Sequence, residues 1–145
     1  MQTSQINQVP KWFWIVASVM LLWNLLGVMA FVQQVTMSPE QINSMPVAEQ
    51  RLYLEQPFWV LLAFAFAVFG GTLGCLALLL KKSFARVIFY LSFIGVLVQM
   101  THSFFISNAL DVYGPGAAVM PIMILIFSIF LIWLSGKAID KGWIA

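Results

Sequence analysis

The sequence predicts an all-α membrane protein whose four helices cross the bilayer and pack as one bundle. Its composition supports this class, because 62% of the 145 residues are hydrophobic and 8% are charged, against roughly 45–50% and about 25% in soluble domains. Four apolar runs carry charges only near their ends, at about residues 12–34, 57–80, 84–106 and 117–135. Because a helix needs roughly 20 residues to cross the hydrocarbon core, we interpret residues 1–145 as a single transmembrane domain.

The charged residues at the ends of these runs predict an orientation. Six of the seven basic residues fall at one set of ends, namely Lys11, Lys81, Lys82, Arg86, Lys137 and Lys141. Four of the five acidic residues fall at the other, namely Glu40, Glu49, Glu55 and Asp111. Basic residues close to a crossing tend to stay in the cytoplasm. We therefore expect both termini to be cytoplasmic and the acidic connections to lie outside.

The connection over residues 35–56 is longer than two adjacent helices require. Its Ser38-Pro39-Glu40 and Met45-Pro46-Val47 segments both resemble helix starts,. We expect one or two short helices at the outer surface, between the first and second crossings. Such a loop can serve as a structural cap, or as a ligand gate or partner site.

A stripe of small residues lies along the second apolar run. Helical spacing places Ala67, Gly70 and Gly74 on one face, together with Ala63 and Ala77,. Small residues let a second backbone approach closely. The stripe therefore predicts helix packing, either within the chain or between copies in an oligomer.

Polar residues within the membrane-spanning runs form a second pattern. Ser92, Gly95, Gln99, His102 and Ser103 fall within an arc of about 100° on the third helix,. A buried amide needs partners, and Asn24 of the first helix is the obvious partner for Gln99. Either these groups join helices, or Asn24, Gln99, His102 and Ser103 line a polar pocket that opens outward, with Asp111 and Tyr113 at its mouth. In the second case His102 could take up a proton near neutral pH.

Several functional classes lack the residues they need. The chain has one histidine and one cysteine, which cannot complete a zinc, haem or iron–sulfur site, and no nucleotide-binding or nucleophile motif is present. The sequence therefore predicts a non-enzyme without a cofactor or metal. The expected partners are the lipid bilayer and a homo-oligomer or larger membrane complex, not nucleic acid.

Four segments resemble a family of small four-helix bacterial membrane proteins. They are Trp23-Asn24-Leu25-Leu26-Gly27, Thr36-Met37-Ser38-Pro39-Glu40, Ala67-Val68-Phe69-Gly70-Gly71 and Gly95-Val96-Leu97-Val98-Gln99. The resemblance implies a four-helix fold in the bacterial inner membrane. Members are often labelled sugar transporter, which names a substrate class but supplies no binding residue.

Three functional hypotheses follow from these patterns. The first is a structural, accessory or small-molecule-binding bundle without catalytic machinery. The second is a transporter of a small neutral, sugar-like solute that works as an oligomer, because four helices are few for a pathway. The third is an enzyme acting on a lipid or quinone, for which the sequence offers no nucleophile or acid–base pair.

Overall fold

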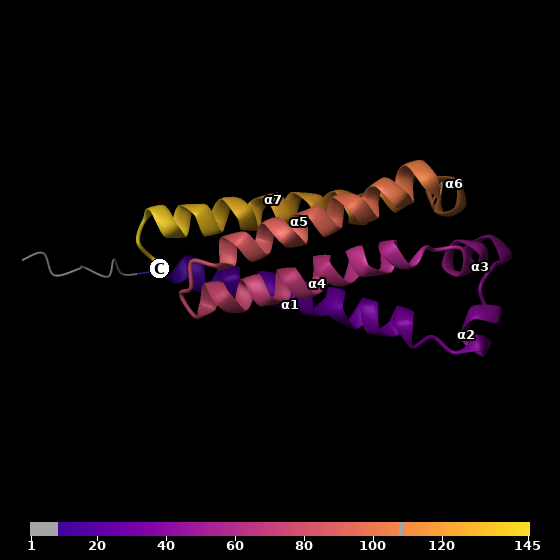
Figure 1. The fold of residues 1–145 in the computed structure, drawn as a ribbon, viewed down its shortest axis with the longest axis horizontal. Helices are drawn as coiled ribbons and strands as arrows, with labels where there is room; N and C mark the ends of the chain where they lie inside the picture. The colour runs from indigo at the N-terminus through magenta and orange to yellow at the C-terminus, as the bar shows by residue number, and fades with distance from the viewer. Residues whose placement is uncertain (1–8, 108) are drawn as a thin grey trace, which may run out of the picture.

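The structure, a computed structural model, describes residues 9–107 and 109–145 (Figure 1). Within these ranges four helices are long and apolar enough to cross a membrane. They are α1 (Lys11–Val35), α4 (Phe58–Leu79), α5 (Ala85–Thr101), which a π-helical segment His102–Ile106 extends, and α7 (Val119–Asp140). The predicted all-α class and the four membrane-compatible helices are confirmed. The largest difference in bounds is at α7, which continues to Asp140 beyond the expected residue 135.

Short helices fill both connections at one end of the bundle. Helices α2 (Pro39–Asn43) and α3 (Val47–Leu54) join α1 to α4, and α6 (Ala109–Tyr113) with a 3₁₀ segment (Pro115–Ala118) precedes α7. Ser38 starts α2 in a capping box with Gln41,. We call this end the loop end, and the opposite end, where α1 begins and α7 ends, the terminal end (Figure 1).

The long helices pack in the order α1, α4, α5, α7, because α4 contacts α1 and α5, and α5 contacts α7. Their largest cluster of buried side chains gathers near the terminal end. It includes Phe13, Ala17, Met20, Cys75, Leu78, Phe89, Leu131 and Leu134. In a bilayer such a cluster is held by van der Waals packing, since lipid tails are as apolar as leucine.

The small-residue stripe of α4 lies against α5. A Cβ atom added to Gly70 would lie 2.9 Å from Cβ of Ser92, and one added to Gly74 would lie 2.4 Å from the Phe89 ring. The Ser92 hydroxyl also donates a hydrogen bond to the Ala67 carbonyl oxygen at 2.6 Å. The three predicted packing residues therefore lie at a helix interface within the chain, and this contact accounts for their size without a second copy.

The terminal end is closed by the last residues of the chain. Ile144 is buried, the Ala145 N–H donates to the Lys81 carbonyl at 3.1 Å, and the Ser83 N–H donates to the Ala145 carbonyl at 3.0 Å. Basic and aromatic side chains gather around it, with Lys137 Nζ 4.9 Å from the centre of the Trp133 ring. The tail therefore ties α7 to the turn between α4 and α5.

Candidate functional site

A cavity of about 330 Å³ lies among the four long helices. We call it the bundle cavity. Its lining is mainly aromatic and aliphatic, and includes Trp23, Asn24, Leu26 and Ala30 of α1, Phe64 and Gly71 of α4, Ser92 and Gln99 of α5, and Met120, Phe127 and Ser128 of α7. Ligand pockets have volumes of about 300–1,000 Å³ and are mostly apolar with a few placed polar groups. The bundle cavity has the size and lining of a small ligand site.

Asn24 lines the bundle cavity, and hydrogen bonds fix the orientation of its side chain. Its Nδ2 donates to the Met20 carbonyl at 2.8 Å and points at Cys75 Sγ at 3.7 Å. Its Oδ1 lies over Gly71, where an added Cβ would be only 1.9 Å away. Among the described residues nothing donates to Oδ1. This oxygen is therefore an acceptor available at the cavity wall.

Gln99 lines the same cavity without bonding to Asn24. A direct Asn24–Gln99 hydrogen bond was one of the possibilities for this pair, and the structure has none, because the Asn24 donor is used within α1 and against α4. Within the described chain the Gln99 side-chain amide has no hydrogen-bond partner, and no fully buried side-chain nitrogen or oxygen lacks one. The Gln99 amide must therefore be accessible from the cavity.

The bundle cavity reaches the protein surface between α1 and α7. Leu26 and Met120 line it and are also 61% and 54% exposed. Nearer the terminal end, Trp23 and Phe127 close the α1–α7 seam edge to face, with ring centres 4.9 Å apart. In a membrane this opening faces lipid, so an apolar molecule can reach the cavity sideways.

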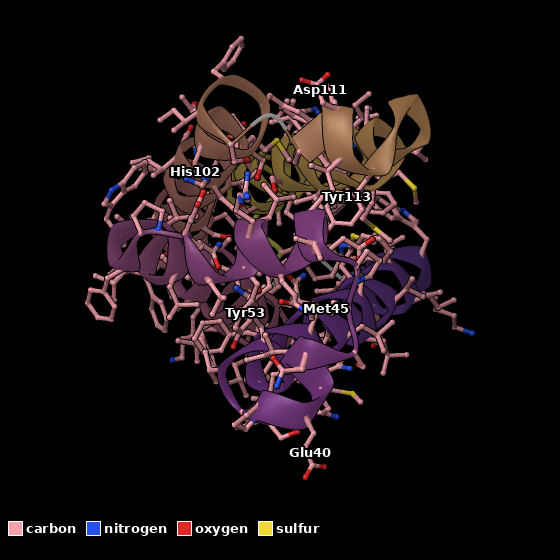
Figure 2. The ribbon with its side chains drawn as sticks, turned by 90° about the vertical axis from the view of Figure 1, so that its right-hand side faces the viewer. Glu40, Met45, Tyr53, His102, Asp111 and Tyr113 are labelled. Atoms are coloured by element: carbon pink, nitrogen blue, oxygen red, sulfur yellow. The ribbon has the colours of Figure 1, made fainter. Side chains whose placement is uncertain are left out.

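A second cavity of about 400 Å³ lies at the loop end. We call it the loop cavity. It is more polar than the first, and its lining includes Gln33, Gln34, Met45, Glu49, Tyr53, Gln56, His102, Ser103, Ser107 and Tyr113. Figure 2 views this end and shows Asp111 and Glu40 pointing outward at opposite rims, away from His102 and Tyr113. Of the two residues predicted at the pocket mouth, Tyr113 is among the residues that line the loop cavity and Asp111 is not.

Hydrogen bonds and ring contacts shape the loop cavity. The Tyr53 hydroxyl donates to the Gln34 carbonyl at 2.7 Å, and the Gln34 side-chain amide donates to Gln56 Oε1. His102 is buried, with its ring edge to face against Trp59 at 5.5 Å. Its imidazole has no hydrogen-bond partner in the described chain. Because His102 lines the cavity, its ring nitrogens are available to a ligand there.

The loop cavity has a negative electrostatic bias. Glu49 is part of its lining, and no lysine or arginine is among the described lining residues. Partial burial, and secondly the charge of Glu49, raise the pKa of Tyr113 above its ordinary value,. The phenol therefore stays neutral and able to donate at physiological pH.

The predicted single pocket is thus divided into two adjoining cavities. Asn24 and Gln99 line the bundle cavity, while His102, Ser103 and Tyr113 line the loop cavity. Ala30 lines both, and His102 follows Gln99 by nearly one helical turn, about 5 Å along the axis. The α3 residues Glu49 and Tyr53 were not expected to line a pocket, because only the tertiary fold brings α3 over the end of α5.

In residues 9–107 and 109–145, no three His, Cys, Asp or Glu side chains are grouped so that they could hold a metal ion. Comparison of the chain with protein-family models, curated proteins and solved structures found no match. The two cavities are therefore the structural features that bear on function.

Proposed function

We propose that this chain is a four-pass membrane protein that binds a small, largely apolar molecule in the bundle cavity. The observation that carries the proposal is the pairing of an apolar cavity, built by all four long helices, with the Asn24 Oδ1 atom and the Gln99 side-chain amide, which lack hydrogen-bond partners among the described residues. A polar group without a partner in the hydrocarbon region is costly. A bound molecule with a hydrogen-bonding group would satisfy the Asn24 oxygen and the Gln99 amide.

The proposed setting is the bacterial inner membrane, with the terminal end in the cytoplasm and α2 and α3 outside. The charge distribution supports this orientation, since six of the seven basic residues lie at the terminal end and four of the five acidic residues lie at the loop end,. The resemblance to small bacterial membrane proteins supports the location. The bilayer is the proposed partner, and a homo-oligomer remains compatible with the exposed apolar faces of the helices.

The proposed role is binding, without catalysis or a cofactor. The bundle-cavity lining offers amide and hydroxyl groups, which position a neutral ligand by hydrogen bonds. The Ser92 and Ser128 hydroxyls already donate to backbone carbonyls at 2.6 and 2.8 Å. Their side chains are thereby held in hydrogen bonds with the helices, which suits a wall that orients a ligand.

Transport of a small neutral solute by an oligomer is the second candidate. The shared lining residue Ala30 favours it, because it places the two cavities next to each other on a route from the loop end to the middle of the bundle. Continuation to the terminal end would require the packed cluster around Phe13, Leu78 and Leu134 to open. Solute uptake into proteoliposomes that contain the purified chain tests this candidate directly.

Quenching of Trp23 fluorescence tests the binding proposal. The protein is placed in phosphatidylcholine nanodiscs and titrated with 1-bromodecane, and the signal of a Trp23→Phe variant is subtracted to isolate Trp23. Binding in the cavity should give saturable quenching, whereas partition into bulk lipid should give quenching that does not saturate.

Two variants on α7 locate the binding. Ser128→Phe fills part of the bundle cavity. It should raise the dissociation constant obtained from the saturable quenching by roughly tenfold, which corresponds to a loss of about 1.4 kcal/mol of binding free energy. Ile129→Phe adds the same ring at a neighbouring residue that is exposed and should leave the dissociation constant unchanged. Quenching that never saturates, or that responds equally to both variants, would contradict the proposal.

A further inference from the structure

We infer that the two cavities together form one site for a single-chain amphiphile, with its hydrocarbon chain in the bundle cavity and an uncharged, hydroxyl-bearing head group in the loop cavity. This inference rests on the proposed binding function and names the chemical class of the ligand. It connects the residues that line the bundle cavity with those that line the loop cavity, whereas the binding proposal concerns the bundle cavity alone.

The first step is the alignment of the two cavities along the bundle. They adjoin at Ala30, a small residue that leaves room at the junction. Gln99 of α5 lines the bundle cavity, and His102 and Ser103, in the π-helical segment that extends α5, line the loop cavity. π-Helical turns inside α-helices are frequent at functional sites. One molecule can therefore extend from Asn24 to the loop end without crossing a helix.

The second step is the chemistry of the loop cavity. Its walls combine the amides of Gln33 and Gln56 with the hydroxyl of Ser103 and the imidazole of His102. These groups donate and accept hydrogen bonds, as a head group with several hydroxyls requires. Because Glu49 is in the lining and no described lining residue is a lysine or arginine, an anionic head would meet repulsion without a compensating partner.

The third step is the match between the site and an amphiphile in a bilayer. An amphiphile holds its head near the membrane surface and its chain toward the middle, which is the order of the two cavities. The bundle cavity opens toward lipid beside Leu26 and Met120. A molecule can therefore move sideways from the outer leaflet into the site without inverting, and its chain meets the aromatic wall at Phe64 and Phe127.

The test compares three probes of equal chain length and bromination in the Trp23 quenching assay. The probes are a monoacylglycerol, the corresponding fatty acid at pH 8, and the bromoalkane. The monoacylglycerol should bind roughly tenfold more tightly than either of the other two, because only its head can form several hydrogen bonds in the loop cavity without bringing a charge.

Variants then separate the head site from the chain site. Ala109→Phe fills part of the loop cavity, which Ala109 lines while not lining the bundle cavity, so it should remove the advantage of the monoacylglycerol while leaving bromoalkane binding within about twofold of wild type. Val32→Phe adds the same ring at a residue that is exposed and should preserve the advantage. Ser103→Ala removes one hydroxyl from the loop cavity and should weaken monoacylglycerol binding a few-fold, without changing bromoalkane binding.

The outcomes distinguish this inference from the function on which it rests. Saturable binding of all three probes with equal affinity, or tighter binding of the fatty acid, would overturn the amphiphile site and leave the apolar binding site intact. Weakening of monoacylglycerol and bromoalkane binding to the same extent by Ala109→Phe would overturn it as well. Failure of every probe to give saturable quenching would overturn both proposals.

Discussion

At the scale of single residues, Asn24 and Gly71 depend on one another. The Asn24 amide is directed by its hydrogen bond to the Met20 carbonyl at 2.8 Å, and this orientation places Oδ1 where a side chain at position 71 would begin. A short side chain such as asparagine cannot move aside without losing that hydrogen bond. The glycine thus keeps a polar acceptor at the wall of an otherwise apolar cavity.

Gly71→Ala should lower the free energy of unfolding by about 1–3 kcal/mol, the usual cost of overpacking. The control is Gly116→Ala, where an added Cβ has no neighbour within 4 Å. In the double variant Asn24→Ala/Gly71→Ala the loss should be smaller than the sum of the single losses, because the clash is gone. Thermal unfolding in detergent micelles measures the wild type, the three single variants Asn24→Ala, Gly71→Ala and Gly116→Ala, and the double variant; equal stability of Gly71→Ala and Gly116→Ala would contradict the prediction.

At the scale of helices, α4 and α7 end in the same motif at the terminal end. After α7, the Trp143 N–H donates to the Ala138 carbonyl and the Gly142 N–H to the Ile139 carbonyl, at 2.8 and 3.1 Å. This Schellman pattern requires a left-handed residue, and Gly142 has φ 74°. In the corresponding position after α4, Lys81 has φ 60°. Both turns hold the chain where the C-terminal residues contact the α4–α5 turn.

Gly142→Ala should destabilise the protein by about 1 kcal/mol, because alanine is strained in the left-handed region. Gly142→Asn should fall between wild type and Gly142→Ala, since asparagine tolerates this conformation better. Unfolding of the three proteins in mixed micelles that contain an increasing fraction of denaturing detergent ranks their stabilities. A Gly142→Ala protein as stable as wild type would show that the turn contributes little to the closed terminal end.

The sequence was enough to predict that the long helices exist, but it was not enough to predict which of their residues contact one another. The long apolar runs require helices because backbone groups must be satisfied internally in lipid. Whether Asn24 and Gln99 bond to each other or face a cavity could not be decided from the sequence, because periodicity gives the face of a helix but not its depth or rotation against a neighbour. The loop cavity depends on α3, whose position comes from local contacts such as Tyr53 with Gln34, and no pattern within residues 47–54 indicates that contact.

At the scale of the whole molecule, the two ends of the bundle differ in packing and in charge. Near the terminal end the core around Phe13, Leu78 and Leu134 is fully buried, whereas toward the loop end the helices enclose both cavities. The basic side chains also gather at the terminal end, where Lys81 lies 5.6 Å from the Trp14 ring and Lys137 contacts Trp133. Aromatic rings near lysines are typical of a membrane–water interface.

This asymmetry predicts that the terminal end faces the cytoplasm, because lysine and arginine next to short connections resist translocation. Alkaline phosphatase, which is active only outside the cytoplasm, should be active when fused after Ala48, between α2 and α4, and inactive when fused after Ala145. A fusion after Lys82, in the turn between α4 and α5, is the matched internal control and should also be inactive. Activity at Lys82 together with inactivity at Ala48 would reverse the proposed orientation, and the loop cavity would then open toward the cytoplasm.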